Sequence, residues 1–131
     1  MPRIKTAKAS RSVLIVDNDK ILVRVLEMKF KKEGFHVTVC HDGQAAIDAL
    51  KKEVFHGVIL DLMMPVKNGY EVLEARVDTI NAATPVFVMS GVASPDAALK
   101  AEALGARKFF MKFRMPLKDV VDEISDAVLG N

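Results

Sequence analysis

Polar side chains stand directly after short apolar runs in this 131-residue chain. The runs and the residues that follow them are Val13–Val16 with Asp17, Asn18 and Asp19, Val58–Leu60 with Asp61, Val86–Met89 with Ser90, and Phe109–Met111 with Lys112. Carboxylates brought to one point repel one another and need a cation. Because the group has hard oxygen donors and no histidine or cysteine, it favours Mg²⁺. A lysine and a hydroxyl facing a metal-bound carboxylate suit phosphoryl transfer, with a carboxylate as acceptor.

These four runs do not alternate with polar residues, which is typical of strands in a parallel sheet covered on both faces. A fifth run, residues 36–40, does alternate, and we expect it at a sheet edge. Helical spacing of apolar residues lies between and after the strands, at residues 21–28, 45–50, 70–77, 97–104 and 117–128. A strand and a helix therefore alternate five times. This order predicts a doubly wound α/β fold, in which the residues after the strands meet at the carboxyl edge of the sheet.

Four segments, taken in order, resemble those of response-regulator receiver domains. They are the acidic strand Val13–Asp17, the acceptor segment Asp61–Glu71, the hydroxyl strand Met89–Gly91 and the lysine strand Gly105–Lys112. The similarity covers about residues 12 to 129. It implies a flavodoxin-like fold with a five-stranded parallel sheet in the order 2-1-3-4-5 and five helices.

The resemblance also implies a metal-dependent acceptor site. Asp61 would take a phosphoryl group from a phosphohistidine on a histidine kinase or phosphotransfer protein. Mg²⁺ would be held by Asp17, Asp61 and the backbone carbonyl of Met63, and more weakly by Asn18. The chain would not be an enzyme toward other substrates, since it would catalyse only its own phosphorylation and dephosphorylation.

The resemblance further implies how the phosphoryl group would be recognised. Lys112 would pair with the acyl phosphate, Ser90 would donate a hydrogen bond to it, and Phe109 would follow Ser90 inward as an aromatic switch. The output partner would be a protein bound through the fourth helix, fifth strand and fifth helix. A homodimer is compatible with the sequence, and we expect no membrane and no direct nucleic-acid contact.

Two positions depart from the family pattern. Asn18 stands where the family has a second acid, so one ligand of the metal would carry no charge. Phe113 follows Lys112 where the family has a proline, usually after a cis bond. Since a cis bond before a residue other than proline costs ~2.5–4 kcal/mol, the Lys112–Phe113 bond is expected to be trans, with the Lys112 ammonium still reaching Asp61.

Other candidate residues have simpler interpretations. Asp19 directly precedes a predicted helix and is expected to be its N-cap. Phe109 is equally consistent with a core residue and with a switch. Cys40 is expected to be a small apolar strand residue. The three histidines are not grouped at metal-ligand spacing, and the sequence assigns them no chemistry.

Two other functions fit parts of the sequence. A pseudo-receiver would have the same fold but would bind a partner without being phosphorylated, and Asn18 and Phe113 favour it. A haloacid dehalogenase-like phosphatase would use Ile15–Asp19 as its nucleophile strand, but it leaves Asp61 unexplained.

Composition separates a basic leader from the rest of the chain. Arg3, Lys5, Lys8 and Arg11 lie in the first eleven residues, which contain no acid, whereas the remainder is slightly acidic. We therefore expect residues 1–11 to be a disordered tail and residues 12–131 to form the receiver domain. The single cysteine excludes an internal disulfide, which fits a cytoplasmic protein.

Overall fold

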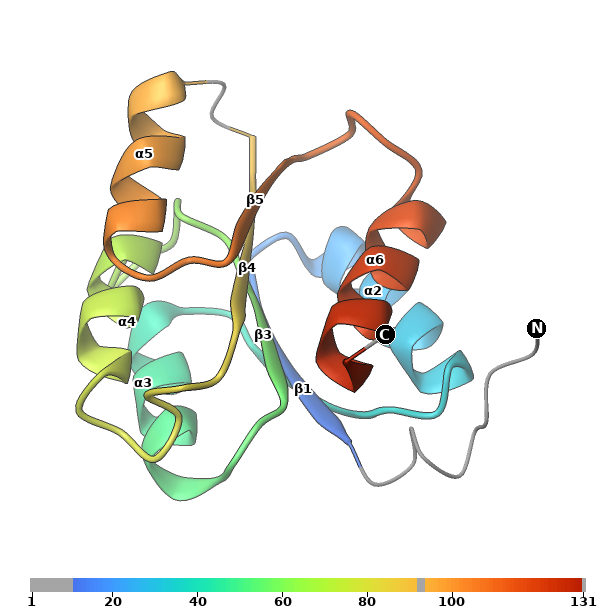
Figure 1. Cartoon of the computed structure of the whole chain (residues 1–131), viewed down its shortest axis with the longest axis horizontal. Helices are drawn as coiled ribbons and strands as arrows, with labels where there is room; N and C mark the ends of the chain where they lie inside the picture. The colour runs from blue at the N-terminus through green and yellow to red at the C-terminus, as the bar shows by residue number, and fades with distance from the viewer. Residues whose placement is uncertain (1–10, 92–93, 131) are drawn as a thin grey trace.

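The computed structural model describes residues 11–91 and 94–130, so the predicted tail, apart from Arg11, lies outside the described residues. Strands and helices alternate along this part of the chain (Figure 1). The strands are β1 (Ser12–Val16), β2 (His36–Cys40), β3 (Gly57–Leu60), β4 (Val86–Ser90) and β5 (Lys108–Met111). The helices are α2 (Lys20–Lys32), α3 (Gly43–Lys52), α4 (Gly69–Arg76), α5 (Pro95–Ala103) and α6 (Leu117–Leu129). All strand pairs are parallel, in the order β2-β1-β3-β4-β5.

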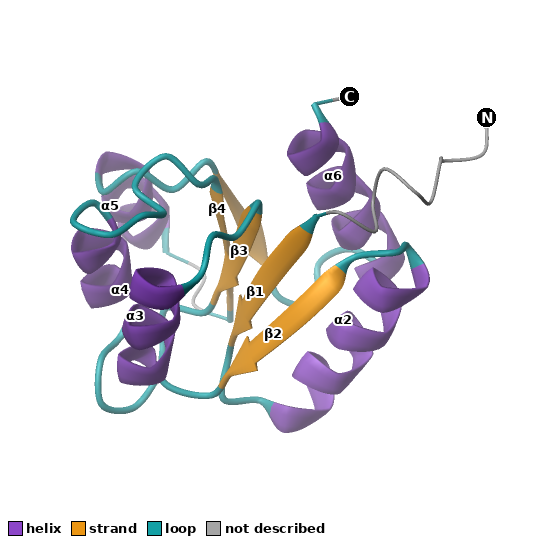
Figure 2. Ribbon diagram, turned by 90° about the horizontal axis from the view of Figure 1, so that it is seen from below, coloured by secondary structure: helices purple, strands orange, loops and turns teal. Residues whose placement is uncertain are grey.

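The predicted doubly wound sheet and its order 2-1-3-4-5 are confirmed, and the alternating strand β2 lies at an edge. Helices α3, α4 and α5 cover one face, and α2 and α6 cover the other (Figure 2). Each face has its own apolar core, because successive strand residues point to opposite sides. Leu14 and Val16 pack toward α3–α5, while Val13 and Ile15 pack toward α2 and α6.

The apolar stripe predicted for the first helix is partly wrong. Leu22, Leu26 and Phe30 are buried at four-residue spacing, whereas Ile21 is 81% and Met28 64% exposed. Ile21 and Met28 lie seven residues apart, two helical turns, and so share the side of α2 that faces solvent. None of the helices in the described part of the chain is long and apolar enough to cross a membrane.

Close backbone approaches hold the loop between β3 and α4 in place. A Cβ atom at Gly43, the first residue of α3, would lie 1.9 Å from the Lys67 carbonyl oxygen. A Cβ atom at Gly69 would lie 2.5 Å from the Asp61 carbonyl oxygen. Both neighbours are backbone atoms that cannot rotate away. Because glycine has no Cβ atom, the loop that follows Asp61 can lie this close to both positions.

Gly43→Ala is expected to lower stability and to displace this loop, because overpacking against backbone typically costs about 1–3 kcal/mol. Gly91→Ala is a matched control, since a Cβ atom at Gly91 would meet nothing within 4 Å. Thermal unfolding of both variants checks the expectation. Equal melting temperatures for the two variants would contradict the tight approach at Gly43.

Candidate phosphoryl-acceptor site

Three of the predicted site side chains extend from the carboxyl edge of the sheet, each from the first residue after its strand. The backbone of each is still tied to the neighbouring strand. Asp17 N–H donates to the Cys40 carbonyl (3.1 Å), Asp61 N–H to the Val16 carbonyl (2.9 Å) and Lys112 N–H to the Ser90 carbonyl (2.8 Å). The pairing of the sheet therefore continues one residue beyond the strands, and it fixes where these side chains start.

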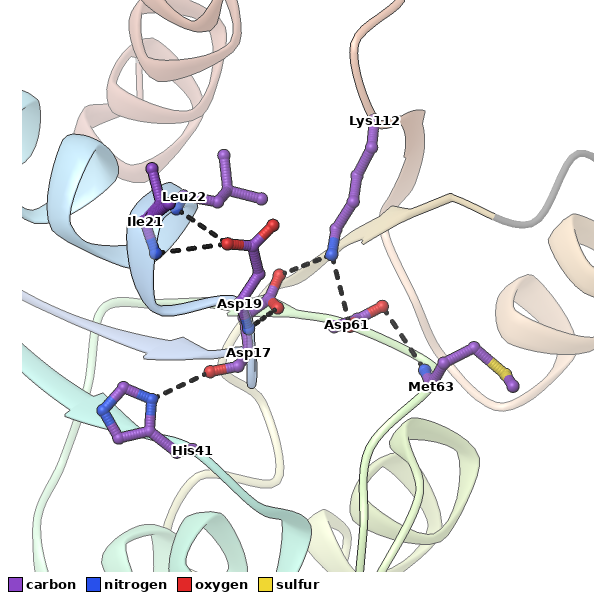
Figure 3. Close-up of polar contacts among 8 residues, drawn as sticks. All are labelled: Asp17, Asp19, Ile21, Leu22, His41, Asp61, Met63 and Lys112. Atoms are coloured by element: carbon purple, nitrogen blue, oxygen red, sulfur yellow. Dashed lines mark hydrogen bonds and ion pairs between the residues drawn. The ribbon is translucent and has the colours of Figure 1, made fainter.

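Lys112 joins the two carboxylates (Figure 3). Its Nζ atom lies 2.9 Å from Asp17 Oδ2 and 3.3 Å from Asp61 Oδ2. The two aspartates are 3% and 4% exposed. Two buried carboxylates thus share one ammonium group, and the cluster carries an excess negative charge.

This charge imbalance changes how Asp61 ionises. Burial raises the pKa of the Asp61 carboxyl, and the neighbouring charge of Asp17 raises it further. Lys112 and a hydrogen bond from Met63 N–H (3.3 Å to Oδ1) oppose the rise without cancelling it. For Lys112 itself, burial lowers the pKa, but its hydrogen bonds and charge interactions with Asp17 and Asp61 outweigh this, and the pKa is raised. The raised pKa of Lys112 favours its charged form, whereas the raised pKa of Asp61 disfavours the charged form of that carboxyl.

Asp19 caps α2, as predicted. Its Oδ1 atom accepts hydrogen bonds from Ile21 N–H (3.2 Å) and Leu22 N–H (3.1 Å), and its own N–H donates to Asp17 Oδ1 (2.9 Å). The Asp19 carboxylate is thus occupied by the helix terminus, while Asn18 beside it is exposed. This arrangement disfavours the phosphatase alternative, in which Asp17 and Asp19 would form a catalytic pair.

The other predicted residues surround this cluster. Ser90 is the last residue of β4 and is fully buried. Phe109 in β5 is half-buried and packs against the core on the α3–α5 face. The Met63 side chain is 64% exposed and points away from Asp61 (Figure 3), so the loop brings the Met63 backbone to the site rather than the thioether.

The chain after Lys112 takes the predicted trans geometry. The described residues contain no cis peptide bond, and the Lys112 ammonium reaches Asp61, as expected. Phe113 adopts φ = 66° and is 79% exposed. A left-handed conformation is uncommon for a bulky residue, and here it turns the chain away from the sheet toward α6.

One contact of the site was not predicted. His41 Nδ1 lies 3.1 Å from the Asp17 carbonyl oxygen, on the side of Asp17 opposite Lys112 (Figure 3). The sequence places His41 just after the strand that pairs with β1, but it does not reveal where the imidazole points. Cys40 is buried at the end of β2, as expected, and burial raises the pKa of its thiol.

The residues present suit a magnesium ion in chemical type. Asp17 and Asp61 supply buried carboxylates, the Asn18 amide and the Met63 carbonyl would supply neutral oxygens, and the cluster has negative charge to neutralise. Within the described ranges, no three acidic, histidine or cysteine side chains are grouped so that they could hold a metal. The donor set is therefore that of a site with two charged ligands.

The fold and this site define a receiver-type α/β domain, and comparison with known proteins agrees. Residues 13–124 match the family model of the response regulator receiver domain. The chain is 34% identical over 103 residues to the transcriptional activator protein PfeR of Pseudomonas aeruginosa, and 36% identical over 100 residues to the transcriptional regulatory protein CpxR of Escherichia coli. These alignments cover 79% and 76% of this chain but only 33% and 42% of those proteins. The chain belongs to the response regulator receiver domain family.

Solved structures share its fold. A CheY-like receiver domain protein from Methanospirillum hungatei has a TM-score of 0.83 at 21% identity, covering 90% of this chain and 93% of that one. The receiver domain of the sensor histidine kinase PA1611 from Pseudomonas aeruginosa has a TM-score of 0.81 at 18% identity, covering 92% and 98%. That domain carries a magnesium ion in its active-site cleft.

Asp61→Asn is expected to raise the melting temperature by a few degrees at neutral pH. A carboxyl whose folded-state pKa is raised destabilises the fold once pH exceeds that pKa, because the unfolded chain ionises more readily. The neutral amide keeps the shape and removes the repulsion with Asp17. The gain should shrink as pH falls through the raised pKa of Asp61. A variant that is less stable than the wild type at pH 7 would show that the Lys112 contact outweighs the repulsion.

Proposed function

We propose that this chain accepts a phosphoryl group on Asp61 from a phosphohistidine of a histidine kinase or phosphotransfer protein. The observation that carries the proposal is the position of Asp61: a buried carboxylate, 3.3 Å from the Lys112 ammonium and beside the Asp17 carboxylate. In the transfer, an Asp61 oxygen forms a bond to phosphorus as the phosphorus–nitrogen bond breaks, and the imidazole leaves. Hydrolysis of the resulting acyl phosphate returns Asp61 and releases inorganic phosphate.

Each neighbour of Asp61 would have a defined part in this step. The Lys112 ammonium would compensate the negative charge on the phosphoryl oxygens. Ser90, at the end of the adjacent strand, would donate a hydrogen bond to one of them. Mg²⁺, held by Asp17, Asp61, the Met63 carbonyl and the Asn18 amide, would supply the remaining positive charge.

The phosphorylated state would act by changing which protein the domain binds. Phe109 lies in β5, beside β4, and would couple Ser90 to the surface formed by α5, β5 and α6. On that surface Leu99 of α5 is 65% exposed, which suits a protein contact. We place this exchange in the cytoplasm, where a kinase or phosphotransfer protein would meet the domain.

The phosphorylation site can be tested by intact mass. Acetyl phosphate with Mg²⁺, or a matched kinase, should add one phosphoryl group to the wild type and none to Asp61→Asn. Asp78→Asn, an exposed acid on the loop after α4, is the control and should be labelled like the wild type. Undiminished labelling of Asp61→Asn would contradict the assignment. A wild type that takes no label from any donor would instead favour the pseudo-receiver.

Asn18→Asp is expected to tighten Mg²⁺ binding by about tenfold. A divalent ion and a unit charge at ~4 Å interact by about 8 kcal/mol at an effective dielectric constant near 20, and most of this is offset by desolvation and ligand repulsion. A net gain on the order of 1–2 kcal/mol remains. One oxygen of the Asp19 carboxylate, Oδ1, caps α2.

The affinity can be followed by NMR titration of the Asp61 amide with Mg²⁺. Asn18→Ala is the control, since it removes the amide without adding charge, and it should bind no more tightly than the wild type. Equal or weaker affinity in Asn18→Asp would show that residue 18 does not reach the ion.

A further inference from the structure

We propose that His41 is a positioning residue for the acceptor site, which it serves by holding the main chain of Asp17. This inference rests on the function proposed above, but its structural part can be tested without phosphorylation. His41 Nδ1 lies 3.1 Å from the Asp17 carbonyl oxygen, which can only accept a hydrogen bond. The imidazole must therefore donate from Nδ1.

The contact stands where the sheet loses its regular pairing. Strands β1 and β2 pair in register as far as Val16 and Cys40, and Asp17 N–H still donates to the Cys40 carbonyl. Beyond His41 the chain turns into α3, because the Asp42 side chain accepts a hydrogen bond from Ala45 N–H (2.8 Å) and caps that helix. The His41 imidazole thus donates a hydrogen bond to the residue that follows β1, at the point where the β2 backbone turns away from the sheet.

Four polar groups of Asp17 are therefore bound by neighbouring residues. Its N–H and C=O are bound by Cys40 and His41, its Oδ2 by Lys112, and its Oδ1 by Asp19 N–H. The Asp17 carbonyl belongs to the peptide that leads to Asn18. If that peptide rotated, it would redirect Asn18 and pull Asp19 N–H away from the Asp17 carboxylate. His41 therefore fixes the orientation of Asp17 and Asn18, the two residues proposed as metal ligands in this turn, through the main-chain carbonyl of Asp17.

A second histidine shows the opposite arrangement at the other end of the same strand. Ser12 N–H donates to His56 Nδ1 at 3.0 Å, so this nitrogen must carry a lone pair. Whenever both imidazoles are neutral, the contacts require the two histidines to be opposite tautomers, with the proton on Nδ1 in His41 and on Nε2 in His56. The NMR signals of the His56 imidazole therefore serve as an internal reference for those of His41.

The first test is the tautomer in the metal-free wild type. Long-range ¹H–¹⁵N NMR at a pH where the imidazoles are neutral should show a protonated Nδ1 for His41 and a protonated Nε2 for His56. A His41 signal typical of the Nε2–H form would overturn the proposal, whether or not the protein is phosphorylated.

The second test compares three variants. His41→Ala should speed hydrogen exchange of the Asp19 amide, weaken Mg²⁺ binding and slow labelling by acetyl phosphate by several-fold. His41→Asn should restore most of each, because its amide nitrogen takes the place of Nδ1. His36→Ala is the control, because His36 is an exposed residue at the start of β2, and this variant should match the wild type. Asp19 exchange that is unchanged in His41→Ala, or no rescue by asparagine, would overturn the proposal.

The two proposals fail in different ways. If the wild type takes no phosphoryl group but shows the Nδ1 tautomer and the asparagine rescue of Asp19 exchange, the phosphorylation proposal fails and the positioning of Asp17 by His41 stands. If the wild type is labelled normally and His41→Ala is labelled equally fast, the phosphorylation proposal stands and the positioning role fails.

Discussion

Burying two carboxylates against a single ammonium group is the constraint that shapes this domain. Asp17 and Asp61 are almost fully buried, and Lys112 is their shared cation. Taking charges out of water is costly, and one lysine cannot compensate two acids. The cluster therefore stays short of positive charge. Burial, and then the neighbouring charge of Asp17, raise the pKa of Asp61. A site in this condition is suited to take up a cation.

The sheet holds this unfavourable cluster together through its main chain. The backbone N–H groups of Asp17, Asp61 and Lys112 donate hydrogen bonds to the neighbouring strands. These bonds determine where each side chain leaves the backbone, independently of the interactions between the charges. Helices on both faces then cover the strands (Figures 1 and 2). Packing of the apolar strand residues thus has a second effect besides stability. It holds the strand backbones in place, and the backbones determine the distances between the charged side chains at the carboxyl edge.

The sequence predicted the parts of this arrangement that depend on periodicity and order. Unbroken apolar runs identified the buried strands, and the polar residue after each run identified Asp17, Asp61 and Lys112. Contacts that depend on side-chain direction were out of reach. His41 was assigned no chemistry because the three histidines are not grouped at metal-ligand spacing, and the sequence does not reveal that its imidazole points toward Asp17. Ile21 and Met28 were counted in the apolar stripe of the first helix, but the structure leaves both exposed.

The two departures from the family pattern lie in different backbone surroundings. Lys112 keeps its place because its N–H is bound to the Ser90 carbonyl, so the change at residue 113 acts only on the chain that follows. There the left-handed conformation of Phe113 turns the backbone toward α6. The change at residue 18 is of another kind, because Asn18 lies in the turn whose main chain is bonded to His41 and to the Asp17 carboxylate. It alters the charge that this turn can offer to a metal rather than the course of the backbone. We therefore expect it to affect the chemistry of the site more than the change at residue 113.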